Sequence, residues 1–516
     1  MASRTWDQSA AKERIAARIR EVESVEVRDY VRETDLTGLG NGLAYRVDGV
    51  HLYVDILNVA EMLNTTAYEG TMVHRRTLRF LNQHYRAVRR ILLAVDAIQI
   101  DFHNQRLHAV FTKPYDDEAA RVHRAIATAQ LIIDVLHLTG EDEDDPLPGA
   151  QVRVGIDSGV ALAVNNGRRG HREPLFLGPP ANLAAKRAGG GSATGIYLTN
   201  TARATIGLDE VDDEDRSALG GSEIALSQEE ADLDVTVEKI VDEWRKGLEK
   251  NPIGVFEFSA HTPPFKDLDL ELLTPANSRR QDAVSIYADI DGFTNYVGDR
   301  VAADETAEDV VRVLHVLRGE LDAVIHSDFA GRKIRFIGDC IHGVLIEGTA
   351  ATTDASQTAT NAMLCAGALR SSFELALSML NDEGIDVGEL GLAIGVEYGV
   401  IAITRLGVKG EMIRCCISRA VLQSEIEQLR CNGSQTAIGA TAKTHCPEAI
   451  ASIFGDSRRK TNLRYETVIA ALEKENSQKA AAQSNSLLRQ ASTVAAAGFT
   501  FPAKAAGPSK TPAGFA

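Results

Sequence analysis

The 516-residue sequence predicts an α/β protein in which one α+β sandwich occurs twice in tandem. The chain is longer than the roughly 250–300 residues at which a single hydrophobic core stops growing. The same order of strands and helices recurs on both sides of an acidic segment, and the internal spacing of the two copies is equal. Asp55 lies 50 positions before Gln105, and Asp289 lies 50 positions before Asp339. Two related domains are therefore expected.

The first copy is predicted from its hydrophobic pattern, because short apolar runs alternate with longer segments of helical periodicity. Its expected elements are, in order, a strand at 50–56, a helix at about 72–95, a hairpin in "AIQIDFHNQRLHAVF", a helix at about 117–138, a strand in "AQVRVGIDSG" and a helix from about 180.

The second copy repeats this order with similar lengths. Its expected elements are a strand at 284–290, a helix at 305–326, a hairpin in "RKIRFIGDCIHGVLI", a helix at about 356–381, a strand in "LGLAIGVEYG" and a helix from about 414.

The segments around the copies differ from them in composition. The expected division is a helical extension at 1–44, the first domain at 45–207, an acidic, proline-bearing connector at 208–280, the second domain at 281–474 and a tail at 475–516. The tail is rich in Ala, Ser, Gln, Gly and Pro. Such a segment cannot bury enough apolar surface to offset its ordering entropy, so it is predicted to be disordered.

Composition narrows the class of protein. A hydrophobic share of 44% and a charged share of 25% are typical of a soluble globular protein. No apolar run approaches the ~18 residues of a membrane span, and the N-terminus lacks the apolar core of a secretory signal, so we expect a cytoplasmic protein without a membrane partner. The six cysteines form no CxxC pair and are expected to be reduced and mostly buried. A net charge of -17 argues against a nucleic-acid partner.

The second copy carries two carboxylates at chemically suggestive positions. Asp289 ends a strand, and "IDGFT" then opens a helix, which places a carboxylate beside backbone N–H groups that suit a phosphate. Asp339 lies at the Gly-Asp tip of the hairpin. If this hairpin lies beside strand 284–290, the two acids converge on one or two divalent cations. Taken singly, the first motif is more often a helix cap and the second a hairpin turn.

"YADIDGFTNYV" and "IRFIGDCIHGVLIEG" together resemble the two metal motifs of the class III nucleotidyl cyclases. The resemblance implies two ions, Mg²⁺ or Mn²⁺, bound by Asp289, Asp339 and the Ile290 carbonyl, with the Gly292, Phe293 and Thr294 turn against the substrate. It also implies attack of a ribose 3′-hydroxyl on the α-phosphate of a nucleoside triphosphate. Cyclases of this class work between two homologous domains, so an intrachain pseudo-heterodimer is expected.

The first copy has Gln105 in place of Asp339, and a neutral amide cannot bridge divalent ions. Its "LFLGPPANLAAKRAGGG" is similar to the Gly-x-x-x-Asn-x-x-x-Arg element of the family. That likeness makes Asn182 and Lys186 the transition-state residues, with Arg187 as an alternative if the helix is rotated. A helix cap and a solvated charge are the simpler interpretation. In the second copy Arg414 and Ser418, or Arg419 after a one-residue slip, are matched to the same positions.

The cation for the γ-phosphate is not assigned by the sequence. The family often has an Arg in the strand of the metal-binding domain, where this chain has Ala393; Arg153 stands at the equivalent place in the first copy.

The base-binding positions matched by the resemblance are Asp101 and Leu175, and they fit neither the adenine pair nor the guanine pair of purine-specific relatives. Tyr53 lies two residues before Asp55 and could narrow the pocket in favour of a pyrimidine, although Tyr287 repeats it and a core role for both is open.

The tandem block, with "EPLFLGPPANLAAK" in the first copy and "CISRAVLQSE" in the second, also resembles the uridylate and cytidylate cyclases of bacterial Pycsar antiphage systems. That likeness implies UTP as substrate, cyclic UMP as product, and a separate effector protein that the product activates without stable contact. The alternatives are a cytidylate cyclase, an adenylate cyclase, and a catalytically silent nucleotide-binding regulatory module. A polymerase-like phosphodiester synthase would need a template groove, which the acidic balance disfavours.

Overall fold

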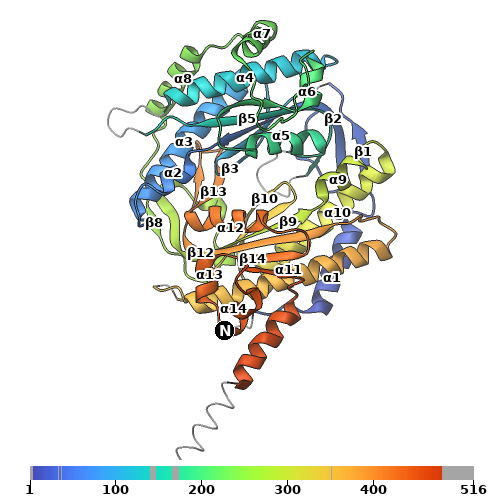
Figure 1. Cartoon of the computed structure of the whole chain (residues 1–516), viewed down its shortest axis with the longest axis vertical. Coiled ribbons are helices and arrows are strands. Elements are labelled where there is room, and N and C mark those ends of the chain that lie inside the picture. Colours follow the sequence, from blue (N-terminus) through green and yellow to red (C-terminus); the bar gives the residue numbers. More distant parts are fainter. Residues whose placement is uncertain are drawn as a thin grey trace, which may run out of the picture.

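A computed structural model of the chain describes residues 4–32, 34–36, 38–139, 147–165, 174–349 and 351–478. These residues form two β-sheets flanked by helices, and the sheets lie one above the other in Figure 1. The prediction of a mixed α/β protein is confirmed. Most of the tail predicted to be disordered lies outside the described residues.

The first sheet has the strand order β3-β4-β2-β5-β6, with β1 on β2 and β7 on β5. The strands are β1 (Glu26–Asp29), β2 (Leu43–Ile56), β3 (Ile98–His103), β4 (Arg106–Phe111), β5 (Val152–Asn165), β6 (Pro174–Leu177) and β7 (Gly195–Leu198). Its helices are α2 (Val59–Leu63), α3 (Thr71–Ala94), α4 (Glu118–Leu138), α5 (Pro179–Gly189) and α6 (Asn200–Thr205).

The second sheet has the order β10-β11-β9-β12-β14-β15, with β13 on β12 and β8 on β9. The strands are β8 (Phe258–Ser259), β9 (Ser278–Asp291), β10 (Arg332–Ile337), β11 (Cys340–Leu345), β12 (Gly391–Leu406), β13 (Ile413–Ile417), β14 (Gln435–Ile438) and β15 (Arg459–Thr461). The helices are α9 (Phe293–Gly298), α10 (Asp304–Ala323) with a π-helical turn at Val324–Asp328, α11 (Ala355–Asp382), α12 (Arg419–Leu429), α13 (Ala440–His445), α14 (Glu448–Phe454) and a last helix over 465–478.

The central four strands have the same order in both sheets, and their side chains repeat as well. Tyr53 pairs with His108 across β2 and β4, and Tyr287 pairs with His342 across β9 and β11. Both pairs are separated by 234 positions from their counterparts, the offset that also relates Asp55 to Asp289. The internal repeat inferred from the sequence is therefore a repeat of strand order and register.

One expected element is wrong. The helix predicted from about 414 begins at Arg419, because β12 continues to Leu406 and returns as the apolar strand β13. Ser418 then caps α12, and its hydroxyl accepts a hydrogen bond from the Val421 N–H at 3.0 Å. The remaining helices and strands of the two copies form where they were expected, with β2, β5, β9 and β12 longer than predicted.

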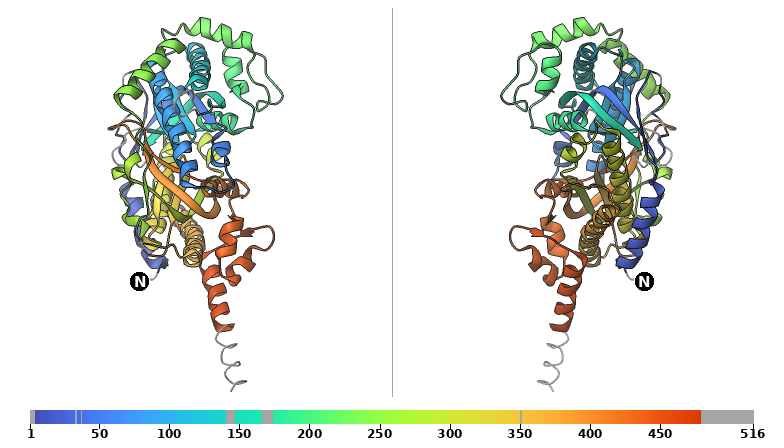
Figure 2. Two further views of the ribbon diagram at one scale, coloured as in Figure 1. Left: turned by 90° about the vertical axis from the view of Figure 1, so that its left-hand side faces the viewer. Right: turned by 90° about the vertical axis from the view of Figure 1, so that its right-hand side faces the viewer.

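The two halves share apolar surface. Side chains of the second half, including Leu406, Ile413, Cys415 and Ile417, are buried in the core of the first half. In the opposite direction α1 (Gln8–Glu21) packs on the second half, where Ile15 is buried and Arg14 pairs with Glu320 at 2.7 Å. Figure 2 shows α1 beside the lower half and the connector helices over the upper half.

The connector is folded rather than extended. It forms α7 (Gly221–Ala231) and α8 (Val237–Lys250), and Ile240, Val241 and Trp244 of α8 are buried in the core of the first half. The amphipathic pattern of α8 explains this, because its apolar face repeats every three to four residues.

The cysteines and the apolar helix α11 bear on the expected burial of the thiols and on a possible membrane span. The six cysteines are free; Cys431 and Cys446 are partly exposed and the other four are buried. Among the described residues α11 alone is long and apolar enough to cross a membrane, and 67% of its most apolar window is buried inside the protein, as in a core helix.

Candidate active site

The two predicted metal-binding acids are brought together by the second sheet. β11 pairs with β9, with Ile341 opposite Ala288, so the β10–β11 tip that carries Asp339 lies beside the end of β9 that carries Asp289. Burial, followed by the charges of Asp291 and Glu425, raises the pKa of Asp289 to about 6. Burial and the charge of Asp289 raise the pKa of Asp339 well above its usual range. The pair thus concentrates negative charge that a cation would relieve.

A tight turn follows the first of these acids. Gly292 has a φ of +83°, and a Cβ there would lie 3.0 Å from the Glu389 carbonyl oxygen, so this position requires glycine. Phe293 anchors the turn with a buried side chain that packs near Tyr296. Ile290 is buried as well. Only the backbone of Ile290 and Phe293 is therefore available to a ligand, whereas Thr294 presents its hydroxyl.

Asn182 meets this turn from the other half of the molecule. Its Nδ2 atom donates a hydrogen bond to the Thr294 Oγ1 atom at 2.9 Å. The helices α5 and α9 approach closely enough that a Cβ on Gly298 would lie 3.1 Å from Pro179. The predicted transition-state amide and the predicted metal-binding turn are therefore neighbours, although 112 positions separate them in sequence. Figure 1 shows α5 above α9 and α12 in the middle of the molecule.

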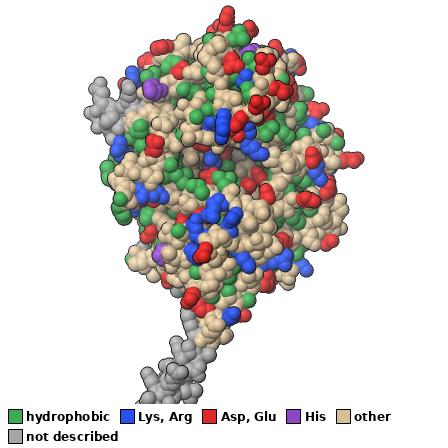
Figure 3. All heavy atoms as spheres, in the orientation of Figure 1, with side chains coloured by type: hydrophobic (Ala, Val, Ile, Leu, Met, Phe, Trp, Pro, Cys, Tyr) green, Lys and Arg blue, Asp and Glu red, His purple; other side chains and the backbone are tan. Residues whose placement is uncertain are grey.

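Lys186 is exposed on α5 one turn after Asn182, on the same face of the helix. Arg187 is occupied elsewhere, because its Nη1 atom pairs with Glu214 at 2.9 Å and with Asp215 at 3.3 Å. Of the two cations weighed from the sequence, Lys186 is exposed, whereas Arg187 is held by two acids of the connector. In Figure 3 the surface is hollowed between the two halves, and basic and acidic side chains gather around the hollow.

Tyr53 and Asp101 adjoin the same region. The ring of Tyr53 stacks on His108 with centroids 4.1 Å apart. Burial raises the pKa of Tyr53, and the nearby charges of Asp101 and Asp339 raise it further. Asp101 accepts a hydrogen bond from the Arg335 Nη2 atom at 2.9 Å. Tyr53 thus lies near both Asp101 and the predicted metal ligand Asp339.

Tyr287 repeats the strand position and the histidine stacking of Tyr53 but is more deeply buried. It is 1% exposed, stacks on His342 at 4.3 Å, and contacts the His103 Nε2 atom through its hydroxyl at 3.3 Å. It is a core residue. Leu175, the other matched base position, is partly buried on β6.

The equivalent place in the first half contains an internal cation. Asp55 is 6% exposed and accepts a hydrogen bond from the Arg106 Nε atom at 3.2 Å. The Nη1 atom of Arg106 pairs with Glu425 of α12. Arg106 stands where the second half has Cys340, and Gln105 stands where it has Asp339. The charge of Asp55 is therefore neutralised by the protein itself.

The matching of α12 to α5 needs correction. Ser418 caps α12 as Gly178 precedes α5, which puts Leu422 and Ile426 at the places of Asn182 and Lys186. The sequence match to Arg414 and Ser418 is eight residues too early, because Arg414 lies on the unforeseen strand β13. That residue pairs with Glu271 at 2.6 Å.

On the strand beside the acids, Ala393 is opposite Asp289 and Arg153 is opposite Asp55. Arg153 is 1% exposed and donates hydrogen bonds to three backbone carbonyl groups, those of Arg187, Ala193 and Asp215. It is a structural residue. Arg318, by contrast, lies near Asp339 and opposes the rise in the pKa of that carboxyl.

Sequence reasoning missed three charged neighbours of the site: Asp291, Glu425 and Arg335. One signal was available for Arg335, which is 234 positions after Asp101. Equivalent positions near a pseudo-twofold axis face each other, and opposite charges at such positions predict an ion pair. Glu425 had no such signal, because Glu425 and its partner Arg106 do not stand at equivalent positions of the two copies.

The paired acids Asp289 and Asp339 on one half, and the contact of Asn182 from the other half with the turn beside them, agree with the resemblance to the class III nucleotidyl cyclases. A uridylate cyclase from Pseudomonas aeruginosa is 55% identical over 474 residues, covering 91% of this chain and 92% of the relative. A uridylate cyclase from a Rhizobium species is 41% identical over 429 residues, covering 80% of this chain and 81% of the relative.

A crystal structure of a class III adenylyl cyclase-like ATP-binding protein from Pseudomonas aeruginosa is 55% identical, has a TM-score of 0.89, and covers 91% of this chain and 99% of its own. No protein-family model matches the chain. The chain belongs to the uridylate cyclase family of class III nucleotidyl cyclases.

Proposed function

We propose that this protein converts UTP to 3′,5′-cyclic UMP and pyrophosphate in a site between its two halves. The observation that carries the proposal is the hydrogen bond from Asn182 to Thr294. It places the Asn182 face of α5 against the turn that follows Asp289, so residues from both halves can contact one triphosphate. The names of the 55% and 41% identical relatives support UTP as the substrate.

Asp289 and Asp339, with the Ile290 carbonyl, would hold two divalent cations, Mg²⁺ or Mn²⁺. The fit is chemical: two carboxylates with raised pKa values lie together, and hard cations prefer such oxygen ligands. Bound there, the ions would activate the ribose 3′-hydroxyl and offset charge on the phosphates. Among the described residues there is no group of three or more His, Cys, Asp and Glu side chains that could form a metal cage. Two acids plus substrate oxygens suit Mg²⁺ better than such a cage.

The other half supplies neutral and positive groups. Asn182 orients the ribose, and Lys186 offsets the negative charge that develops on the α-phosphate as the ring closes. Lys186 acts as a point charge, so its contribution depends on its position more than on a fixed hydrogen-bond geometry. The Gly292–Thr294 turn contacts the phosphates through its backbone.

The base pocket is bounded by Tyr53 and Asp101. The ring of Tyr53, stacked on His108, narrows the space available to a base. Asp101 is held by Arg335, which fixes its carboxylate at the edge of the pocket. A carboxylate accepts from the N3–H group of uracil, whereas cytosine has no such donor at N3.

The test is incubation of the purified protein with each of the four nucleoside triphosphates and Mn²⁺, followed by chromatographic resolution of the products. Cyclic UMP as the main product is expected. Cyclic CMP or cyclic AMP alone would overturn the substrate assignment but leave the cyclase assignment intact. The Asp289→Ala variant, which lacks a proposed metal ligand, gives the background level of product.

Adenylate cyclisation is the second candidate, because the 55% identical solved relative is described as an ATP-binding protein of the adenylyl cyclase type. The two candidates differ in the size of the base. Tyr53→Ala enlarges the pocket, so a shift of product from cyclic UMP towards cyclic AMP in this variant supports the role of Tyr53 in selecting the smaller base.

The pairing of halves is proposed to occur within one chain, with domains at 45–207 and 281–474. Mixing Asp289→Ala with Lys186→Gln tests this, since each variant lacks a different half of the site. No activity should return on mixing. Recovery of activity would show that sites form between chains.

The biological role proposed is antiphage defence in the cytoplasm, with cyclic UMP acting on a separate effector. This part rests on the resemblance to Pycsar cyclases. A plaque assay in cells carrying the wild-type or the Asp289→Ala chain tests it: equal plaque counts with both would contradict the role.

A further inference from the structure

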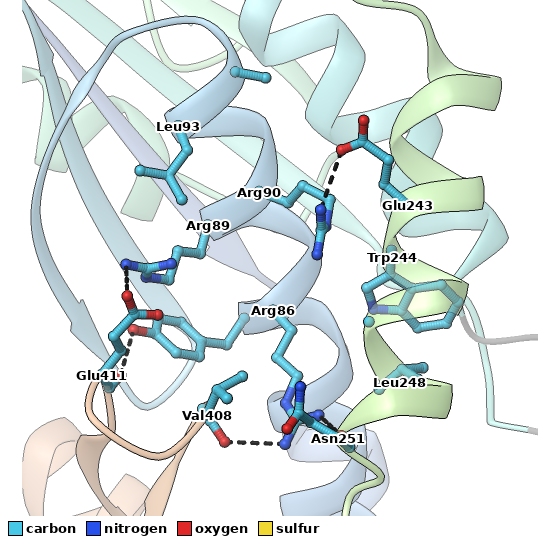
Figure 4. A pocket seen from close by; sticks show the side chains of 14 residues that line it. Arg86, Arg89, Arg90, Leu93, Glu243, Trp244, Leu248, Asn251, Val408 and Glu411 are labelled. Atoms are coloured by element: carbon cyan, nitrogen blue, oxygen red, sulfur yellow. Dashed lines mark hydrogen bonds and ion pairs between the residues drawn. The ribbon is translucent and has the colours of Figure 1, made fainter.

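A second cavity lies away from the candidate active site, between α3, α8 and the loop that joins β12 to β13 (Figure 4). Its volume is about 450 Å³, within the usual range of small-molecule sites. Three arginines of α3 line it, and none of its lining residues belongs to the candidate active site.

Arg86 is the central feature of this cavity. Its guanidinium donates hydrogen bonds to the Asn82 Oδ1 atom at 3.0 Å and to the carbonyl oxygens of Gly407 and Asn251. None of these partners carries a charge. Burial lowers the pKa of Arg86, and no acid among the described residues offsets the effect. A partly buried cation without a counterion is costly, and an anion in the cavity would remove that cost.

Arg89 and Arg90 extend the positive surface. Arg89 pairs with Glu411 at 2.8 Å and Arg90 with Glu243 at 3.1 Å. The two acids are 49% and 40% exposed, so these pairs are weak and can open to a competing ligand. Figure 4 shows the acids on opposite sides of the cavity. These three arginines lie within five residues of one helix, in a chain with a net charge of -17.

The rest of the wall is apolar. Trp244 is fixed by a hydrogen bond from its indole N–H to the Gln83 carbonyl at 3.2 Å, and Leu93 and Leu248 lie beside the cavity. A phosphate alone would leave this surface uncovered. A phosphate joined to a flat or apolar group would contact both parts.

We propose that this cavity is a binding site for a phosphate-bearing small molecule of about mononucleotide size, with its phosphate at Arg86 and Arg89 and its base or other apolar part against Trp244. The site is independent of the identity of the cyclase substrate. It joins the connector, the first half and a loop of the second half, so the bound ligand would hold three separate segments together.

Isothermal titration calorimetry without divalent cations tests the proposal, with UMP, inorganic phosphate and uridine as probes. UMP should bind more tightly than phosphate, and uridine should not bind. Arg86→Gln should weaken UMP binding about tenfold, the effect expected when a charge-assisted hydrogen bond is lost. Glu411→Gln should tighten it roughly two- to fivefold, because Arg89 loses its competing partner.

Gly247→Met provides a second test of the cavity in case Arg86→Gln does not fold. A Cβ at Gly247 would lie 3.0 Å from the Arg90 Nη2 atom, so a longer side chain enters the cavity without removing a cation. It should abolish UMP binding in a protein whose thermal unfolding is unchanged or raised. Hydrogen exchange at 407–412 and 243–251 should slow when UMP is added to the wild type.

Four results would overturn the proposal. They are absence of UMP binding by the wild type at millimolar concentration, uridine binding as tight as that of UMP, unchanged affinity in both Arg86→Gln and Gly247→Met, and binding that is lost only in Lys186→Gln. The last would place the anion in the cleft between the halves.

Discussion

Asp289 on β9 and Asp55 on β2 occupy equivalent positions in the two halves, but their surroundings differ. Asp289 has Asp339 and Asp291 nearby, and its pKa is raised to about 6. Asp55 has the guanidinium of Arg106, which also reaches Glu425 across the interface. The acids around Asp289 concentrate negative charge that a bound cation would offset. Asp55 is paired with the cation Arg106, which also links the two halves through Glu425.

The largest expected effect separates these two roles. Asp289→Asn should lower the rate of cyclisation by roughly a thousandfold, because a lost metal ligand removes several kcal/mol of transition-state stabilisation. The matched change Asp55→Asn should alter the rate by less than about threefold, since Asp55 contacts Arg106 and not the substrate. Product formation under saturating UTP is the measurement. Equal losses in both variants would contradict the division of roles.

The second effect concerns the other side of the cleft. Lys186→Gln should lower kcat by about a hundredfold with a smaller change in KM, because its charge acts mainly on the transition state. Arg187→Gln is the control, and its loss of contact with Glu214 and Asp215 should mainly affect stability. A greater loss of kcat in the Arg187 variant would show that the helix face has been assigned incorrectly.

The third effect concerns the contribution of Arg106, the internal cation of the first half, to the free energy of unfolding. Arg106→Met should reduce the free energy of unfolding by about 2 kcal/mol, since it leaves Asp55 and Glu425 without their partner at partly buried positions. Adding Asp55→Asn to this variant should restore part of the loss, although Asp55→Asn alone is destabilising. Chemical denaturation of the four proteins measures the coupling. Additive losses would mean that Arg106 and Asp55 do not interact.

The smallest effect is the pH dependence of the intact site. The raised pKa of Asp289 means that the folded protein binds more protons than the unfolded chain between the ordinary carboxyl pKa and about 6. Stability of the metal-free protein should therefore fall as pH rises towards and through about 6, by roughly 1 kcal/mol from this group after allowance for its partial exposure.

This pH effect can be checked by thermal unfolding of the wild type and Asp289→Asn with and without Mn²⁺. Without the ion, the variant should be the more stable protein above about pH 7, and the difference should vanish near about pH 4, where Asp289 is protonated. Mn²⁺ should stabilise only the wild type, and less so at acid pH. A wild type that gains stability with rising pH relative to the variant would contradict the sign.

The sequence predicted the internal repeat and most of the helices and strands. The equal 50-residue spacing of Asp55 to Gln105 and of Asp289 to Asp339 identified the repeat, and apolar periodicity located the long helices α3, α4 and α11. The start of α12 was misplaced because the apolar run "IRCCI" fits a helix or a strand equally well over so short a length. Only its pairing with β12 distinguishes the two.

The candidate site also has one part that the sequence determined and another that only the tertiary structure decided. Sequence alone determined which residue types each half retains: two acids at Asp289 and Asp339, and an amide and an amine at Asn182 and Lys186. Tertiary structure decided that Asn182 reaches Thr294, that Arg187 is held by the connector, and that Arg106 neutralises Asp55. The physical reason is that local patterns and spacing act along the chain, whereas charge pairing and burial depend on which distant segments the shared core brings together.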